Sequence, residues 1–307
     1  MGTTDLAIDT RSLRKAFGSN VAVRGLTLAV ARGEVFGFLG PNGAGKTTSI
    51  KMLLGLVKPT SGSATLLGLP ISDRRARSRA GFLPEHFRFH DWLKATEFLT
   101  LHGQLYGMDN TRLARRVNEL LELVGLASFR DAQLRTFSKG MLQRIGLAQA
   151  LLNEPEIVFL DEPTSGLDPV GRRLVRDIIR QLRGAGTTVF LNSHLLSEVE
   201  ITCDRVAFIK HGEVVRVSQV STLVDGSTTV TIRARGFTPE VIGLLSNFGR
   251  DVRIEGENIM LSVDNESALP EINRALVERG IDVYAIVPQR LSLEDLFLQV
   301  VGTDGGL

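Results

Sequence analysis

The sequence predicts an α/β fold with a parallel-sheet core, followed in the chain by a smaller α+β domain, and three observations lead to this prediction. Short apolar runs rich in strand-forming residues occur at residues 35–39, 157–160 and 187–191, as expected of strands buried on both faces of a parallel sheet. Helical patterns at residues 49–57 and 169–183 alternate with these runs. Beyond residue 228 the order becomes strand, helix, strand, strand, helix, strand and helix, which predicts a ferredoxin-like fold.

The chain of 307 residues is long enough for two domains. We predict the first over residues 1–220 and the second, with a regulatory or dimer-forming role, over residues 221–307. Within the first, residues 6–30 alternate in a strand-like way around a turn at Phe17, which predicts an antiparallel β subdomain. Residues of about 86–150 have mainly helical spacing and predict a helical insertion.

Charge and cysteine content exclude some classes of protein. The formal net charge is only +2 and the basic residues are scattered, so we expect no nucleic-acid partner. The exception is a cluster at Arg74, Arg75, Arg77 and Arg79, which we interpret as a solvated face. The single cysteine, Cys203, cannot form an internal disulfide and fits a reducing compartment. No apolar run approaches the roughly 18 residues that a membrane span requires, so we expect a cytoplasmic protein.

The most informative motif is GPNGAGKTT at residues 40–48, which fits the phosphate-loop pattern GxxxxGK[ST] between a predicted strand and a predicted helix. Glycines at 40, 43 and 45 permit backbone dihedrals closed to other residues, so successive amides can point at phosphate oxygens. Lys46 would reach the β- and γ-phosphates, and the Thr47 hydroxyl would bind Mg²⁺. The alternative interpretation is an ordinary glycine-rich turn.

Polar residues follow two further predicted strands of the core. Asp161 and Glu162 follow residues 157–160, and His194 comes shortly after residues 187–191. Because ligands of open α/β sheets bind at the carboxyl edge, Asp161 would hold Mg²⁺ or its water, and Glu162 would orient or deprotonate an attacking water. The alternatives are two solvated carboxylates and a histidine that merely ends a strand. Ser138 and Gly140 begin a predicted helix and form a second anion site, which suggests the nucleotide of a partner.

Four motifs in fixed order now resemble the ATP-binding subunit of an ABC transporter, a P-loop NTPase, over residues 6–220. They are GPNGAGKTT at 40–48, FSKGMLQR at 137–144, IVFLDEPTSGLD at 157–168 and Asn-Ser-His at 192–194. The resemblance implies that Phe17 stacks on adenine, although a lone Phe can also be a core residue. It further implies ATP contacts from the rest of the phosphate loop, namely Asn42, Gly43, Gly45, Lys46, Thr47 and Thr48.

The same resemblance assigns catalytic and subunit-bridging roles. Glu162 would be the catalytic base, and His194 would contact the γ-phosphate. Ser138 and Gly140 would cap the γ-phosphate held by a second copy of the chain, with Asp168 helping to join the two halves. Glu85 occupies the place of the family's usual Q-loop glutamine and is a further candidate Mg²⁺ ligand.

Two departures from the family pattern are visible. The usual signature is LSGGQ, whereas here Phe137, Lys139 and Met141 replace its first, third and fifth residues. The residues that would face phosphate are kept, so we expect catalysis to survive. At position 85 a carboxylate can still bind Mg²⁺, but it adds negative charge beside a triphosphate and donates no hydrogen bond when ionised.

The resemblance implies an ATP hydrolase in which two copies close around two ATP molecules. It further implies a separate transmembrane permease that docks near residues 85–105 and holds the subunit on the inner face of the cell membrane. Three features are similar to those of the ABC-2 type drug and polymer exporters, and we therefore expect export. They are the signature at 137–141, the Leu-Pro-Glu at 83–85 and the ending at 292–295.

Other functions stay open at this point. A cytoplasmic ABC ATPase that remodels ribosomes or DNA usually carries two cassettes, a coiled-coil arm or zinc sites, and none of these is visible in the sequence. A P-loop kinase would have no use for the Ser138 signature. A nucleotide-gated regulatory subunit that hydrolyses little ATP is the alternative that Glu85 favours.

Overall fold

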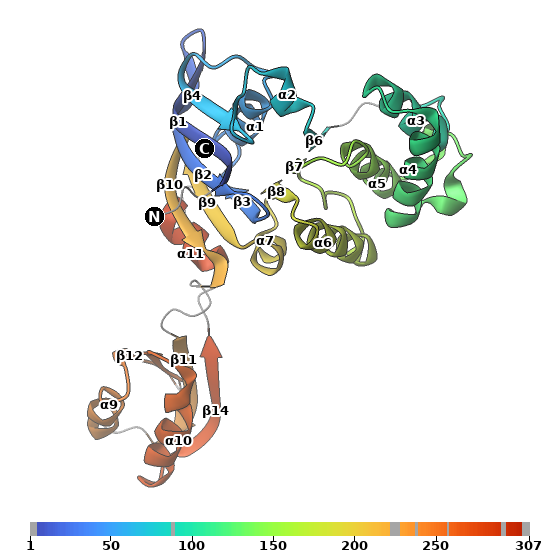
Figure 1. Cartoon of the computed structure of the whole chain (residues 1–307). Helices are drawn as coiled ribbons and strands as arrows, with labels where there is room; N and C mark the ends of the chain where they lie inside the picture. The colour runs from blue at the N-terminus through green and yellow to red at the C-terminus, as the bar shows by residue number, and fades with distance from the viewer. Residues whose placement is uncertain are drawn as a thin grey trace. The chain divides into compact units, whose positions relative to one another are not determined.

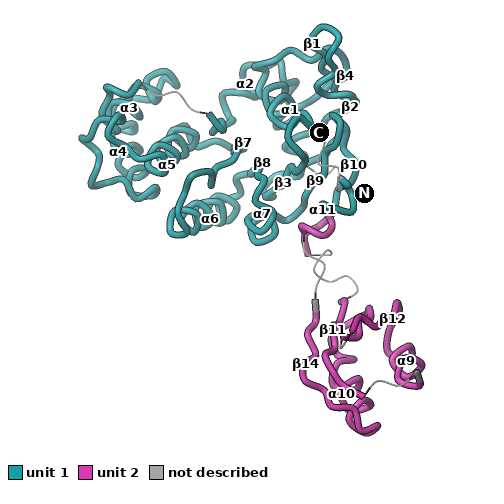
Figure 2. Tube along the Cα trace, turned by 180° about the vertical axis from the view of Figure 1, so that it is seen from behind, with its two compact units in different colours: residues 1–218, 297–307 teal, residues 219–296 magenta. Residues whose placement is uncertain are grey.

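The computed structural model describes residues 5–86, 90–221, 228–236, 239–256, 258–289 and 293–302. The chain divides into two compact units, residues 1–218 with 297–307 and residues 219–296 (Figure 2). The division falls two residues before the domain boundary expected at 220/221, and it also groups the second half of the last helix, α11 (Leu293–Val301), with the first unit.

The first unit is built on a sheet of ten described strands in the order β5-β4-β1-β2-β10-β9-β3-β8-β7-β6. Its β9-β3-β8-β7-β6 half is parallel and apolar. Every residue of β3, β8 and β7 is buried, which confirms the core strands expected from their apolar sequence. The bounds of this half are β9 (Arg205–Lys210), β3 (Val35–Leu39), β8 (Thr188–Asn192), β7 (Ile157–Asp161) and β6 (Ala80–Leu83).

The other half of the sheet contains the predicted antiparallel β subdomain. β1 pairs with β2 on one side and with β4 on the other, both antiparallel, and the β1–β2 hairpin closes at Phe17 opposite Asn20, where the turn was predicted. A single parallel bridge, Glu213 to Gly25, joins β10 to β2. The bounds are β1 (Leu6–Phe17), β2 (Asn20–Ala31), β4 (Ser61–Leu66), β5 (Leu69–Pro70) and β10 (Glu213–Gln219).

The helices of the first unit follow the sequence pattern closely. The helix expected at residues 49–57 begins three residues earlier, at Lys46, and ends at Leu53. The helices of the expected insertion stand together at one end of the unit (Figure 1). The bounds are α1 (Lys46–Leu53), α2 (Arg74–Arg77), α3 (Ala95–Leu105), α4 (Asn110–Leu123), α5 (Lys139–Ala150), α6 (Pro169–Gly184) and α7 (Leu196–Thr202), with 3-10 turns at Ala127–Phe129 and Leu134–Thr136.

The second unit has a four-stranded antiparallel sheet in the order β12-β13-β11-β14. Alternate residues of β11 and β13 are buried and form its core with the inner faces of its helices. Its elements are β11 (Thr228–Arg235), α9 (Pro239–Leu245), β12 (Arg250–Glu255), β13 (Asn258–Val263), a 3-10 turn (Glu266–Ala268), α10 (Leu269–Val277) and β14 (Asp282–Gln289). The sequence predicts a linker at 221–226 and helix starts at Thr238 and Ser292; residues 222–226, Thr238 and Ser292 lie outside the described residues.

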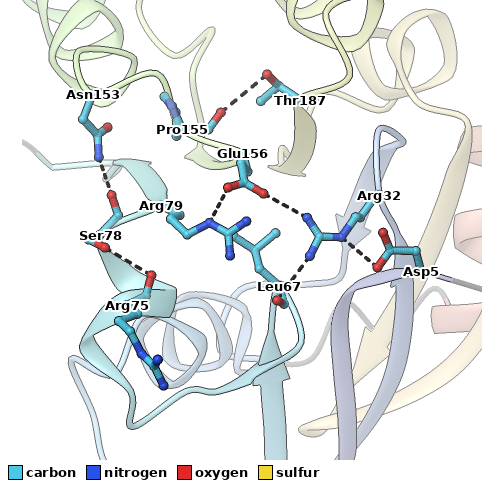
Figure 3. Close-up of polar contacts among 10 residues, drawn as sticks. All are labelled: Asp5, Arg32, Leu67, Arg75, Ser78, Arg79, Asn153, Pro155, Glu156 and Thr187. Carbon is cyan, nitrogen blue, oxygen red and sulfur yellow. Dashed lines mark hydrogen bonds and ion pairs between the residues drawn. The ribbon is translucent and has the colours of Figure 1, made fainter.

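A charged cluster ties the amino ends of the core strands together (Figure 3). The Glu156 carboxylate precedes β7 and accepts hydrogen bonds from Arg79, next to β6, and from Arg32, in the turn between β2 and β3, the latter at 2.9 Å. Arg32 also donates to Asp5 and to the Leu67 carbonyl, so the cluster spans both halves of the sheet. The interpretation of the arginine cluster as a solvated face is therefore wrong for Arg79.

The Glu156 cluster predicts a pH dependence of stability. Hydrogen bonds from Arg79 and Arg32 lower the pKa of Glu156, so its contribution is fully present above the unfolded pKa of about 4.3 and is lost as the pH falls through the lower folded value. Because the carboxylate is 41% exposed, we expect Glu156→Gln to lower the free energy of unfolding by only about 1 kcal/mol at pH 7.

Urea unfolding of both proteins between pH 7 and pH 3.5 measures this difference. The gap between wild type and Glu156→Gln should narrow with acidification, and a gap that is constant across the range would contradict the prediction.

Candidate functional site

The strand register brings three chain segments to one edge of the sheet. β8 lies between β3 and β7, and Asn192 pairs with Phe38 on one side and with Asp161 on the other. Because all three strands are parallel, the residues that follow them meet at their carboxyl ends. The phosphate loop follows β3, Glu162 follows β7 and His194 comes two residues after β8. The phosphate loop and the polar residues predicted after the other two strands therefore share one site.

The phosphate loop is held against neighbouring strands at two glycines. Gly45 has φ +97°, and a Cβ atom there would lie 2.5 Å from the Ala22 carbonyl oxygen of β2. Gly40 differs from the expectation, because its φ is not positive; a Cβ atom would instead lie 2.3 Å from the Ile209 carbonyl oxygen of β9. Its glycine is required by this close approach. The α1 helix begins directly after Gly45, so its positive end faces the loop.

Lys46 and Thr47 connect the loop to the Asp161 carboxylate. The Lys46 Nζ donates to the carbonyls of Gly40 at 2.7 Å and Pro41 at 3.0 Å, which holds the ammonium across the loop. Burial lowers the pKa of Lys46, while the charges of Glu162, Asp161 and Glu85 act in the opposite direction. The Thr47 hydroxyl donates to Asp161 Oδ2 at 3.3 Å, so the two oxygen atoms predicted to bind Mg²⁺ lie side by side.

Asp161 is fixed by a residue without a predicted role. The Asn192 side chain is buried and its Nδ2 donates to Asp161 Oδ1. Burial raises the pKa of Asp161, opposed by hydrogen bonds from Asn192 and Thr47. Among the described residues, no three His, Cys, Asp or Glu side chains form a metal-binding group. Adjacent hydroxyl and carboxylate oxygens nevertheless suit Mg²⁺, which keeps several waters and takes further ligands from substrate phosphates.

Glu162 has an unusual backbone conformation. Its φ is +55°, a left-handed value that costs a residue with a side chain roughly 1–3 kcal/mol. Its N–H donates to the Asn192 carbonyl at 2.9 Å. Its Oε2 lies 2.6 Å from the His194 Nδ1, and burial raises the pKa of Glu162 while His194 acts in the opposite direction. His194 itself is 63% exposed, so its ring links the buried carboxylate to the open side of the site.

Ser138, Gly140 and Asp168 lie apart from the phosphate loop of their own chain. They line a hollow of about 530 Å³ that contains no phosphate-loop residue. Ser138 caps α5 by accepting from the Met141 N–H at 3.3 Å, as predicted, and Asp168 caps α6 by accepting from the Gly171 N–H at 2.7 Å. Phe137, the first residue of the unusual signature, is buried.

The remaining predicted residues lie on several different elements. Phe17 is 51% exposed at the tip of the β1–β2 hairpin, so it is not a core residue. Glu85 is exposed just after β6. Burial is the main cause that lowers the pKa of Lys46 and raises the pKa of Asp161, and the charge of Glu85 is a smaller influence that acts upward on both. Asn42 lines a pocket of about 310 Å³ with His194. Thr48 lies in the first turn of α1.

Three residues near the site were missed by sequence analysis. Asn192 was seen at the sheet edge, but its bond to Asp161 depends on the register of β7 and β8. Gln143 of α5 donates to the Glu162 carbonyl, a contact across 19 residues that no local pattern signals. Phe297 of α11 lines the Asn42 pocket and contacts the ring of Phe208, with centroids 6.3 Å apart.

Comparisons with known proteins identify the family. A family model described as ABC transporter matches residues 23–165. The chain is 42% identical to an uncharacterized ABC transporter ATP-binding protein of Synechocystis over 91% of this chain and 78% of that protein. It is 35% identical to the Nod factor export ATP-binding protein I of Rhizobium sp. (strain N33), over 97% and 98% respectively. A solved ATP-binding subunit of an ABC transporter is 28% identical, with a TM-score of 0.66, over 71% of this chain and 91% of that one.

The site and these matches define an ATP-binding subunit of P-loop type. The chain belongs to the family of ABC transporter ATP-binding proteins, ATPases coupled to transport. As a member it works within a transporter complex that has membrane subunits. No helix in the described part of the chain is both long and apolar enough to cross a bilayer.

The loop geometry predicts unequal costs for two glycine substitutions. Gly43 also has a positive φ of +79°, but a Cβ atom there meets nothing within 4 Å. We expect Gly43→Ala to lower the free energy of unfolding by about 1 kcal/mol, the backbone cost alone. Gly45→Ala adds the clash with β2 and should cost roughly 2–4 kcal/mol. Urea unfolding without nucleotide measures both, and equal losses would contradict the role given to the close approach.

Proposed function

We propose that this chain hydrolyses ATP as half of a dimer that energises export through a separate transmembrane permease. The observation that carries the proposal is the contact between Glu162 and His194 beside a phosphate loop, at the edge where Asp161 and Thr47 also meet. The name of the Nod factor export relative supports export as the direction.

Within one subunit, each group has a distinct task. Lys46 and the loop amides would bind the β- and γ-phosphates, with contacts from Asn42, Gly43, Gly45 and Thr48, and Phe17 would stack on adenine. Thr47 and Asp161 would hold Mg²⁺, with Glu85 as a third oxygen ligand. The ion would neutralise charge that develops on the phosphate oxygens.

Glu162 and His194 would then act on the attacking water. The Glu162 carboxylate would take a proton from this water, and its raised pKa moves it toward the range useful for a general base. His194 would orient that carboxylate through Nδ1 and present its exposed side to the γ-phosphate. Positioning and electrostatics carry most of the catalysis in phosphoryl transfer, so these groups should act as one assembly.

The second anion site supports a dimer. The hollow at Ser138 and Gly140 combines a helix N-terminus with no phosphate loop of its own. We infer that it receives the γ-phosphate bound by a second copy, with Asp168 at the join. ATP would bridge the two copies, and loss of the γ-phosphate would release them.

The helical insertion supports a docking site for the permease. Four large apolar side chains are exposed around α3, close to the range predicted for docking: Trp92, Leu101, Leu105 and Tyr106. Contact with the permease would cover this apolar surface and would hold the subunit at the inner face of the cell membrane. The near-neutral charge supports the absence of a nucleic-acid partner.

For the C-terminal residues we propose a ferredoxin-like domain with a regulatory or dimer-stabilising role. The strand order β12-β13-β11-β14 supports that fold. Phe297 supports regulation, since it lines a pocket with Asn42 and His194. The alternative of a regulatory subunit with little hydrolysis is favoured by Glu85 and differs from our proposal in its steady-state ATPase rate.

Replacing the base tests the hydrolytic role. We expect Glu162→Gln to lower kcat about 10²–10⁴-fold, because an amide cannot accept the proton. ATP binding should be retained, so the variant should accumulate as an ATP-bound dimer in size-exclusion chromatography. Wild-type protein provides the control, and rapid turnover by Glu162→Gln would refute the assignment.

Mixing two inactive variants tests the shared sites. Lys46→Ala removes the phosphate-loop site and Ser138→Arg blocks the receiving site, so each protein alone should be inactive. In the mixed dimer, the intact loop of one chain faces the intact Ser138 helix of the other. A 1:1 mixture should regain roughly a quarter of the wild-type rate if the sites act independently. No recovery, although mixed dimers form, would contradict sites built across subunits.

A further inference from the structure

We propose that Gln143 is a positioning residue that holds the main chain of Glu162 in its working conformation. The inference rests on the proposed role of Glu162 as the base. The Gln143 Nε2 donates to the Glu162 carbonyl oxygen at 3.1 Å, from α5 to the segment that follows β7. Gln143 would act only through Glu162, since none of its described contacts involves the phosphate loop.

The peptide between Glu162 and the next residue has few means of being held. Residue 163 is proline, so this peptide has no N–H and can be fixed only through its carbonyl oxygen. Two donors reach that oxygen, Gln143 and the Ser165 N–H, the latter also at 3.1 Å. The hydrogen bond from Ser165 lies within the same short segment, so it moves with this segment and does not fix it to another element. The Gln143 bond is therefore the one that anchors the peptide to a separate element.

The left-handed backbone conformation of Glu162 needs this support. Glu162 has φ +55° and precedes a proline, and both conditions restrict its backbone. A rotation of this residue would move its carboxylate away from the His194 Nδ1, which lies 2.6 Å away. Small displacements of a catalytic group cost rate more than binding, because the reacting atoms must be aligned.

The anchor also connects two sites in one chain. Gln143 lies five residues after Ser138 on the same helix, and Ser138 caps the N-terminus proposed to receive the partner's nucleotide. A movement of α5 as that nucleotide binds would be transmitted to the Glu162 carbonyl. The helix that receives one ATP would thus position the base that acts on the other.

The test compares three substitutions of Gln143. Gln143→Leu keeps a similar volume without a donor, Gln143→Glu is isosteric and does not donate when ionised, and Gln143→Lys supplies another N–H donor. We expect the first two to lower kcat about tenfold to a hundredfold, with the Kd for Mg²⁺-ATP changed less than threefold. Gln143→Lys should recover most of the rate. Gln181→Leu, an exposed position on α6, is the control and should match wild type.

A second measurement separates positioning from general destabilisation. In a Glu162→Gln background, where the base is already lost, Gln143→Leu should change the single-turnover rate less than twofold. Wild-type kcat in Gln143→Leu and Gln143→Glu would overturn the inference, as would a full additional loss in the Glu162→Gln background. If Glu162→Gln itself turns over rapidly, the proposed base is wrong; if it is inactive while Gln143→Leu is not, only the anchor is wrong.

Discussion

The parallel pairing of β3, β8 and β7 is the constraint on which the site depends. The register sets Asn192 opposite both Phe38 and Asp161, so the segments after all three strands meet at one sheet edge. A slip in the register between β7 and β8 would move Asn192 out of its pairing with Asp161 and break the hydrogen bond between their side chains. The Glu156 cluster lies at the opposite, amino end of β7 and links it to Arg79, before β6, and to Arg32, in the turn between β2 and β3. Charge pairing at one edge thus supports the alignment of the candidate site residues at the other.

Burial at the carboxyl edge explains the electrostatics of the site. Loss of solvent on burial is the largest cause of the pKa shifts of Lys46, Asp161 and Glu162, and in each case it disfavours the charged form. Each group nevertheless has a partner of opposite charge or a hydrogen-bond donor nearby that favours its charged form. Charged side chains are thus kept in a poorly solvated site, where electrostatic interactions with a phosphate group are stronger than in water.

Local signals in the sequence predicted much of this structure. The buried strands follow from short apolar runs, the Ser138 cap follows from its place before a helix, and the phosphate loop from its glycine spacing. Contacts between distant residues could not be predicted in this way. The Glu156 bond to Arg32 spans 124 residues, and the grouping of Phe297 with the first unit depends on packing against Phe208. Gly40 was predicted correctly as a loop residue but for a different physical reason, since the approach of β9 is invisible in the local sequence.

The Glu162 backbone shows why the proposed catalytic base needs long-range support. Its local sequence, a bulky residue before proline, disfavours the left-handed conformation that the structure adopts. The conformation must therefore be imposed from outside the segment, by the Asn192 carbonyl on one side and by Gln143 on the other. Asn192 belongs to the strand that also positions Asp161, while Gln143 belongs to the helix that begins at Ser138. The proposed base is thus held between the strand that pairs with Asp161 and the helix that begins at Ser138, and a shift of either one would change its alignment.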